Sequence, residues 1–431
     1  MNFDQPIYIV DGIRTPFAKM GTAFAETDAV ELGRVAVAEL LAKTGMDPAT
    51  IEEVIFGCVA QPADAANIAR VIALRAGVPD TVSAVTVHRN CASGFESVTQ
   101  AAEKMMVGRG DVFMVGGTEN MTLVPLLYSA TAAKKFTALA RAKSMKEKLA
   151  VATSFRPEDF KPRIGLQMGL SDPVSGLNMG QTAENVARDF NITREEQDKF
   201  SLSSHLKAVA AQDRLKQEIT PVYLPKVRNG QAYIDEDNGP RKGQTMEALA
   251  KLKPVFERVS GSVTAGNASQ ITDGAVALLM MTEKALKASG LTPLGKLVGF
   301  QYAGCDPTRM GLGPVYAINK AEQRYGLGIK DADLIEINEA FAAQVIGCQR
   351  AARDEKYCRE KLGRDSALGE IPDEILNVNG GAIALGHPVG VTGARLVLTG
   401  LKELHRRKAK RALLSLCVGG GQGGALWVER V

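Results

Sequence analysis

Three short stretches of the sequence combine a thiol or an imidazole with unusually many small residues. The first reads His-Arg-Asn-Cys-Ala-Ser-Gly-Phe over residues 88–95, between a predicted strand and a predicted helix. A cysteine at the start of a helix faces free backbone N–H groups and the positive end of the helix dipole, which lower a thiol pKa. We therefore expect Cys91 to be a nucleophile, with a buried packing cysteine as the alternative.

The second stretch surrounds one of only four histidines with glycines and reads Asn-Val-Asn-Gly-Gly-Ala-Ile-Ala-Leu-Gly-His-Pro over residues 377–388. Pro388 fits the first position of a helix, which places His387 at the N-cap. The helix dipole there disfavours an imidazolium, so His387 is expected to be a neutral base that takes a thiol proton. A purely structural histidine is the alternative.

The third stretch follows a predicted buried strand and reads Leu-Cys-Val-Gly-Gly-Gly-Gln-Gly-Gly over residues 416–424. The exposed backbone N–H groups of such a turn form an oxyanion hole when they converge, and Cys417 is a candidate proton shuttle. A phosphate cradle is a weaker alternative, because the run lacks a Walker A Gly-Lys-Ser/Thr and a dinucleotide-binding context. A tight turn without a ligand also remains open.

Short β-branched runs alternate with helical patterns along most of the chain, which predicts an α/β fold. The second half repeats the order of the first, and residues 45–57 and 326–338 occupy matching places. Such self-similarity predicts two related halves that face a shared site. The expected strands are 7–10, 54–56, 85–87, 112–115, 297–300, 334–337 and 412–417, and the expected helices are 30–43, 95–107, 315–325 and 391–406.

The alternation stops between the halves, where residues 120–253 predict a loop domain that covers the site. The N-terminal half then comprises residues 1–119 with about 254–285, and the C-terminal half comprises 286–431. Residues 134–148 are basic and amphipathic. We expect these residues to form a solvated surface. The alternative is a docking surface for the phosphates of coenzyme A, for a partner subunit or for a membrane.

The composition is that of a globular protein, with 431 residues, 45% hydrophobic and 23% charged. A net charge of +4 argues against a nucleic-acid partner. The six cysteines show no CxxC spacing, which argues against zinc and disulfides and for a reducing compartment.

Residues 1–10 do not resemble a signal peptide, no apolar run reaches the roughly 18 residues of a membrane span, and the last three residues are no peroxisomal signal. The cytoplasm is the expected location.

These stretches, with Ile-Asn-Glu-Ala-Phe-Ala-Ala-Gln at 337–344, resemble the thiolase family in order and spacing. The resemblance runs from residue 7 to the last strand and includes Gly-Ser-Val-Thr-Ala-Gly-Asn-Ala-Ser at 261–269. It implies the α/β thiolase fold, in which two βαβαβαββ halves form five α-β-α-β-α layers with an inserted loop domain. It also implies homodimers or homotetramers that act on CoA thioesters.

The resemblance also assigns roles to individual residues. Cys91 would carry the acyl group, His387 would activate it, and Cys417 would exchange the proton on the acetyl methyl carbon. One oxyanion hole would use the backbone N–H groups of Cys91 and Gly419, and a second would use His387 with a water held by Asn338. The residues expected to contact the CoA substrate are Ser269, Ala268, Met179 and Phe341.

Other segments point to one branch of the family, the thiolase subunit of trifunctional β-oxidation complexes. These segments are 130–175, 237–241, 252–254 and 356–363. That branch generally has His-Glu-Ala-Phe, but Asn338 stands here as in acetoacetyl-CoA thiolases, and Asn178 replaces the histidine of many short-chain thiolases.

We expect cleavage of 3-ketoacyl-CoA by CoA in fatty-acid β-oxidation, with biosynthesis of acetoacetyl-CoA as the alternative. A hydratase–dehydrogenase subunit is a possible partner. Coenzyme A is a substrate in this scheme, and neither a metal nor another cofactor is required.

Three rival functions remain. Ketoacyl synthases share the fold and the nucleophile but pair the cysteine with two histidines or with His and Asn, whereas Cys417 stands in the third place here. A cysteine hydrolase would pass the acyl group to water. A non-catalytic subunit would be expected to lose at least one of the chemical groups, and all four blocks are intact.

Overall fold

The computed structural model describes residues 5–228 and 230–431. Residues 1–4, in the segment where no signal peptide is predicted, and Asn229, in the predicted loop domain, lie outside the described residues. Within the described ranges, no helix is both long and apolar enough to cross a membrane.

The aliphatic and β-branched runs of the first half form one set of strands, because such side chains pack well on a buried pleated surface. β3 lies between β4 and β5 and is parallel to both, while β10 is antiparallel to β5 and to β1. The bounds are β1 (Ile7–Arg14), β3 (Glu53–Gly57), β4 (Ser83–Val87), β5 (Val112–Glu119) and β10 (Thr272–Thr282). β5 therefore continues through two glycines, beyond the predicted end of this strand.

The second half repeats this arrangement. β12 is parallel to β13, β14 is antiparallel to β13 and β11, and Leu376 bridges Ile335 in parallel where β4 pairs with β3 in the first half. The two sets meet where β1 and β11 pair antiparallel. The bounds are β11 (Gly295–Gly304), β12 (Leu334–Ile337), β13 (Arg411–Val418) and β14 (Gln422–Arg430). The predicted duplication is confirmed.

The matching turns show why the halves fold alike. α1 (Ala29–Thr44) and α12 (Gly313–Tyr325) both end at a glycine in the left-handed region, Gly45 at φ 66° and Gly326 at φ 70°. Glycine adopts this conformation without a Cβ penalty, so it terminates helices well. Each is followed by a short 3-10 turn and then by a parallel strand, β3 or β12.

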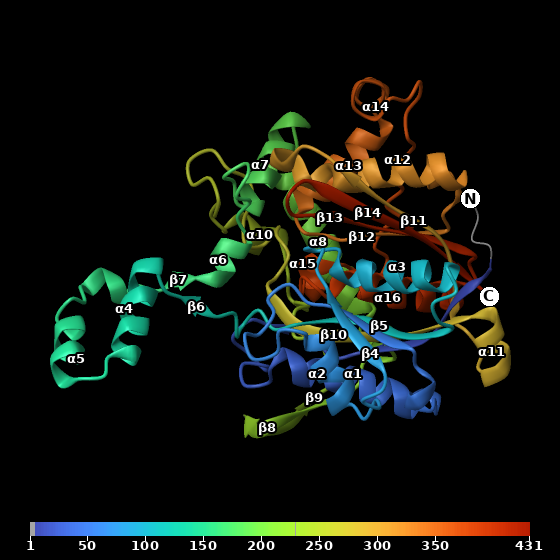
Figure 1. The fold of residues 1–431 in the computed structure, drawn as a ribbon. Coiled ribbons are helices and arrows are strands. Elements are labelled where there is room, and N and C mark those ends of the chain that lie inside the picture. The colour runs from blue at the N-terminus through green and yellow to red at the C-terminus, as the bar shows by residue number, and fades with distance from the viewer. Residues whose placement is uncertain (1–4, 229) are drawn as a thin grey trace.

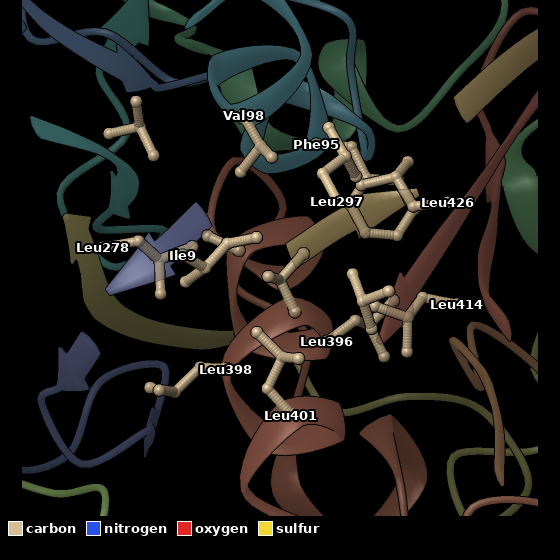
Figure 2. Packing of buried hydrophobic residues seen from close by; sticks show 14 of the residues in the cluster. Ile9, Phe95, Val98, Leu278, Leu297, Leu396, Leu398, Leu401, Leu414 and Leu426 are labelled. Carbon is tan, nitrogen blue, oxygen red and sulfur yellow. The ribbon is translucent and has the colours of Figure 1, made fainter. Parts of the chain in front are cut away.

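The helices and sheets form five layers (Figure 1). α1 and α2 (Ile68–Arg75) cover one outer face, and α12 and α13 (Ala342–Arg353) cover the other. α3 (Ser93–Met106) and α16 (Thr392–Arg407) lie between the two sets of strands. Figure 2 shows this central core, where Phe95 and Val98 of α3 and Leu396 of α16 belong to one buried cluster with residues of both sheets.

The first turns of α3 and α16 touch through glycines. A Cβ added to Gly94 would lie 2.6 Å from the backbone nitrogen of Ala394, and one added to Gly393 would lie 2.3 Å from that of Phe95. Only glycine permits such close backbone approach. The contact brings the segments that precede the two helices, one from each half, to the same place.

The segment between the halves contains helices and two small two-stranded sheets, β6 with β7 and β8 with β9. α7 and α8 pack against the C-terminal half, whereas α4 and α5 stand apart from the body as a helical pair that carries the basic residues 134–148 (Figure 1). The division at residues 120–253 stays a prediction. The bounds are β6 (Leu126–Leu127), α4 (Ala130–Arg141), α5 (Met145–Ala152), β7 (Arg163–Ile164), α6 (Gly165–Gly169), α7 (Met179–Asp189), α8 (Arg194–Ala210), α9 (Gln212–Lys216), β8 (Val222–Arg228), β9 (Gln231–Ile234) and α10 (Met246–Ala250).

The remaining elements are short and connect the layers. They are β2 (Ala18–Lys19), α11 (Glu283–Ser289), α14 (Glu355–Leu362), α15 (Ala382–Leu385) and the 3-10 turns Pro48–Thr50, Pro157–Phe160, Pro307–Leu312 and Ile329–Asp331.

Candidate active site

Cys91 lies in a tight turn between β4 and α3, as predicted. The turn is closed by the Ser93 hydroxyl, which donates to the carbonyl of Asn90 at 2.7 Å and accepts from the backbone N–H of Arg89 at 2.9 Å. Ala92 is the N-cap of α3, so Cys91 stands one residue outside the helix. The small side chains after the cysteine allow this turn to form beside the α16 backbone.

The predicted lowering of the Cys91 thiol pKa is wrong. Burial raises this pKa above its ordinary value, and the backbone N–H groups of Gly419 and of Cys91 itself offset the effect only partly. The negative charge of buried Glu119 adds to the increase. Because the thiol is protonated at neutral pH, it requires a base before it attacks a substrate.

His387 lies in the extended segment that precedes α16. Its backbone N–H donates to the carbonyl of Gln270 at 2.9 Å. The predicted N-cap position is wrong, because the N-cap is Val391 and α16 begins at Thr392. Residues 388–391 form a separate turn, in which the N–H groups of Val391 and Thr392 donate to the Pro388 carbonyl.

A hydrogen bond to Thr392 fixes the proton of the imidazole. Nδ1 of His387 lies 2.5 Å from the hydroxyl oxygen of Thr392, and that hydroxyl donates its own hydrogen to the carbonyl of Pro388 at 3.1 Å. The hydroxyl oxygen therefore accepts from Nδ1–H. We assign the proton to Nδ1 on this basis, which leaves the lone pair on Nε2.

His387 is a neutral base, as predicted, but for another reason. Burial, assisted by the positive charge of Arg395, lowers the pKa of His387 to about 4. Arg395 is itself buried and forms an ion pair with Glu336 at 3.0 Å. Nε2 is buried and has no protein hydrogen-bond partner in the described part of the chain.

Cys417 lies at the end of β13, with only 1% of its surface exposed. Burial raises the pKa of its thiol well above the ordinary value, and the charge of a Cys91 thiolate would raise it further. Cys417 lies two residues before Gly419, which is hydrogen-bonded to the neighbour of Cys91, so the two thiols belong to one site. A thiol with a raised pKa is a proton donor to a strongly basic centre such as a carbanion.

The glycine turn after Cys417 meets the nucleophile turn. The backbone N–H of Gly419 acts on the Cys91 thiol and lowers its pKa, and the role of this N–H in an oxyanion hole stays a prediction. The side-chain amide of Asn90 donates to the Gly419 carbonyl at 2.7 Å. Sequence reasoning did not assign a role to Asn90.

Asn338 follows β12 and is fully buried. Its backbone N–H donates to the carbonyl of Ser415 at 2.9 Å, but neither polar atom of its side chain has a protein partner among the described residues. A buried amide without a partner is costly, so a bound molecule that hydrogen-bonds to it is favoured. This property agrees with the predicted role of holding a water.

The neighbouring Glu339 is fully engaged. Its carboxylate accepts from the Ser204 hydroxyl at 2.6 Å, from Asn377 Nδ2 at 3.0 Å and from the backbone N–H of Ile383 at 3.2 Å. These bonds hold the segment before His387 against the end of β12. Sequence reasoning missed this positioning role, although the glutamate is part of the Asn-Glu-Ala-Phe block.

Three of the four residues expected to contact the substrate pack with Cys417. Met179, Ala268 and Phe341 belong to one apolar cluster with Cys417, and Ala268 bridges Phe341 in antiparallel fashion. Ser269 follows, with its N–H bonded to the Ala340 carbonyl at 2.9 Å.

The structure adds Phe256 to this cluster, edge-on to Phe341 with the ring centroids 6.1 Å apart. Gly180 makes room for Phe256, because a Cβ on that glycine would lie 2.3 Å from the ring. No signal in the sequence separates Phe256 from an ordinary core residue. Asn178, beside Met179, caps α7 through a reciprocal bond pair with Gln181.

The geometry suits acyl transfer through a cysteine. It combines a protonated thiol, a neutral imidazole with an unpartnered Nε2, a second thiol and the buried, unpartnered amide of Asn338. Among the described residues, no group of three or more His, Cys, Asp or Glu side chains is arranged to hold a metal ion.

Comparisons with known proteins agree with this geometry. A family model for the thiolase N-terminal domain matches residues 7–284, and one for the thiolase C-terminal domain matches residues 291–430. A 3-ketoacyl-CoA thiolase of Serratia proteamaculans (strain 568) is 41% identical over 426 residues, which are 98% of this chain and 96% of that protein.

Solved structures are similar over the whole chain. The acetyl-CoA acetyltransferase of Bacillus anthracis has a TM-score of 0.86 and 36% identity, with full coverage of both chains. Human mitochondrial 3-ketoacyl-CoA thiolase has a TM-score of 0.85 and 35% identity over 99% of each chain, and it has also been solved in complex with CoA. On its matched domains and its relatives, the chain belongs to the thiolase family.

Proposed function

We propose that this protein cleaves 3-ketoacyl-CoA with CoA, giving acetyl-CoA and a shortened acyl-CoA through an acyl group on Cys91. The observation that carries the proposal is that the turn of Cys91 meets two segments of the second half. One is the glycine turn after Cys417, reached through the Asn90–Gly419 hydrogen bond, and the other is the start of α16, just after His387. The name of the Serratia relative and that of the human structure support the same substrate class.

The first half-reaction breaks the carbon–carbon bond. Nε2 of His387 takes the thiol proton, and the sulfur of Cys91 attacks the keto carbon. The backbone N–H groups of Cys91 and Gly419 stabilise the resulting oxyanion. The bond to the acetyl unit then breaks, and Cys417 protonates the carbon of the acetyl-CoA enolate that leaves.

The enolate oxygen requires its own donors while it carries negative charge. A water held by Asn338, together with His387 in its protonated form, supplies them in this proposal. In the second half-reaction the Cys417 thiolate takes the proton of the CoA thiol, and the CoA sulfur attacks the acyl group on Cys91. His387 returns its proton to the Cys91 sulfur that leaves. The products are an acyl-CoA and the regenerated cysteine. Coenzyme A is a substrate here, and the steps use no further cofactor.

Acylation of Cys91 tests the proposal directly. The protein is incubated with acetoacetyl-CoA in the absence of free CoA, and intact mass and peptide mapping follow. We expect an acetyl adduct on Cys91 that added CoA removes as acetyl-CoA. An unmodified Cys91 in folded protein would contradict the proposal, and discharge to water in place of CoA would favour a hydrolase.

A second candidate is the synthesis of acetoacetyl-CoA from acetyl-CoA. Asn338 in the Asn-Glu-Ala-Phe block and the similarity to the Bacillus anthracis acetyl-CoA acetyltransferase favour it. Turnover of acetoacetyl-CoA is to be compared with that of 3-ketodecanoyl-CoA and 3-ketohexadecanoyl-CoA. Degradative function predicts turnover of the long substrates, and activity confined to acetoacetyl-CoA would favour the second candidate.

Substitution of Asn338 by alanine tests the oxyanion hole for the enolate independently of the one at Cys91. We expect thiolysis of acetoacetyl-CoA to slow by roughly a hundredfold, the typical effect of losing one donor. Exchange of labelled CoA into acetyl-CoA forms no enolate, so it should stay within about threefold of wild type. Rapid-quench thiolysis and the exchange assay measure the two rates in the same preparation. Equal losses in both would exclude a role specific to the enolate.

Assembly and location belong to the same proposal. β4 is the last strand of the first half's sheet and has no further strand beside it among the described residues. Edge strands pair readily with another chain, which supports a homodimer or homotetramer. All six cysteines are free thiols, which supports the cytoplasm. Light scattering of the protein alone, and with a hydratase–dehydrogenase subunit, tests the assembly.

A further inference from the structure

Asn90 connects the two halves of the chain at the active site. Its Nδ2 donates to the carbonyl oxygen of Gly419 at 2.7 Å, across 329 positions of sequence. The bond joins the nucleophile turn of the first half to the glycine turn of the second. Asn90 immediately precedes Cys91, and the backbone N–H of Gly419 lowers the pKa of the Cys91 thiol.

The backbone of Asn90 is held in an unusual conformation. Its φ angle is +43°, in the left-handed region that asparagine tolerates better than most residues with a side chain. The hydrogen bonds of Ser93 and Arg89 close this turn. Because the turn is fixed, the direction in which the Asn90 side chain leaves it is fixed as well.

The glycine turn has little to define its own shape. Gly420 and Gly421 have φ angles of +89° and +81°, and a Cβ added to Gly420 would meet nothing within 4 Å. Consecutive glycines have a large conformational entropy to lose when they are ordered. The far end is held where the N–H of Cys305 donates to the carbonyl of Gly421 at 2.8 Å. The near end is held by Asn90.

We propose that Asn90 is a positioning residue for the oxyanion hole: its amide fixes Gly419 so that the N–H of Gly419 points at the Cys91 sulfur and at the acyl oxygen. The acyl-transfer part of this inference rests on the proposed function. The amide of Asn90 acts through Gly419 and not on the substrate. Its loss therefore weakens every step that passes through the tetrahedral centre on Cys91.

Two substitutions isolate the amide. Asn90→Gly keeps the left-handed backbone and removes the bond, while Asn90→Ser removes the amide and adds no charge beside Cys91. Asn191→Gly is the matched control, because Asn191 is exposed, has a φ angle of +50° and lies in the turn between α7 and α8. This control reports the effect of replacing asparagine by glycine in a left-handed turn that does not adjoin Cys91.

Two readouts follow Cys91. Exchange of labelled CoA into acetyl-CoA measures acyl transfer, and we expect its rate to fall at least about tenfold in Asn90→Gly. A misdirected N–H donor should lower the rate, but by less than the complete loss of that donor. Alkylation of Cys91 by iodoacetamide, quantified by peptide mass across pH, measures thiolate formation. The N–H of Gly419 lowers the pKa of Cys91, so we expect the alkylation profile of Asn90→Gly to move to higher pH. Asn191→Gly should match wild type in both.

Wild-type rates and an unshifted alkylation profile in Asn90→Gly would overturn the proposal. If Asn90→Gly melts well below Asn191→Gly, Asn90→Ser decides: a shifted profile supports the positioning role, and an unshifted profile overturns it. The alkylation assay does not depend on acyl transfer. A wild-type protein that never acylates Cys91 would therefore refute the proposed function, while the profile would still decide the role of Asn90.

Discussion

Replacement of Cys91 by alanine is expected to reduce thiolysis at least about ten-thousand-fold, because removal of a covalent nucleophile leaves only binding and oxyanion stabilisation. The loss should appear in kcat and in the acyl adduct together. Rapid-quench thiolysis of acetoacetyl-CoA and intact mass after incubation without CoA measure it. Binding of CoA, followed by calorimetry, should change little, since the variant keeps the Met179, Ala268 and Phe341 cluster.

Cys305→Ala is the matched control for a thiol near the site. Cys305 is half-buried, and its backbone N–H, which alanine retains, donates to the Gly421 carbonyl at 2.8 Å. We expect this variant to keep activity within a few-fold of wild type. An acyl adduct that persists in Cys91→Ala would show that another cysteine carries the acyl group and would contradict the assignment of the nucleophile.

Much of the fold follows from local sequence signals. β12 forms over residues 334–337 as predicted, and the helix expected over 30–43 extends by one residue at each end. Gly45 and Gly326 mark equivalent helix ends in the two halves, so the duplication is visible before any contact is known. The parallel bridge at Leu376 is not predictable in this way, since it depends on pairing with β12 and is too short to leave a pattern.

The protonation states of the site residues were harder to predict than their identities. Helix position predicted a lowered thiol pKa for Cys91, but burial by both halves outweighs it, and burial arises only when the halves pack together. The same burial lowers the pKa of His387, which stands before a turn and not at a helix end. Asn90 and Thr392 act through hydrogen bonds that form only in the folded protein. The sequence signal for Asn90 is its position next to Cys91, and Thr392 has no such signal.

The rate at which acetoacetyl-CoA acylates Cys91 is expected to be nearly independent of pH between roughly 5.5 and 7.5. With a pKa of about 4, His387 is protonated to only a few per cent at the lower limit. With an unshifted pKa of 6.5 the imidazole would be mostly protonated there, and the rate would fall about tenfold. Single-turnover acylation, quenched and measured by mass at each pH, gives the profile. A midpoint near 6.5 would contradict the effect of burial.

Removal of the base should change both the rate and its pH dependence. In His387→Gln we expect acylation at neutral pH to fall by about 10³- to 10⁴-fold, the upper part of the range for general-base catalysis. The Cys91 thiol must then ionise unaided, and its raised pKa makes the remaining rate climb about tenfold per pH unit.

Thr392→Val is the finer test, because it removes only the acceptor that holds the proton on Nδ1. We expect it to keep the flat profile of wild type at a rate reduced roughly tenfold, since a fraction of the imidazole then presents N–H and not a lone pair to the thiol. A wild-type profile that itself climbs tenfold per unit would show that the thiolate forms without His387, and the base would have to be sought elsewhere.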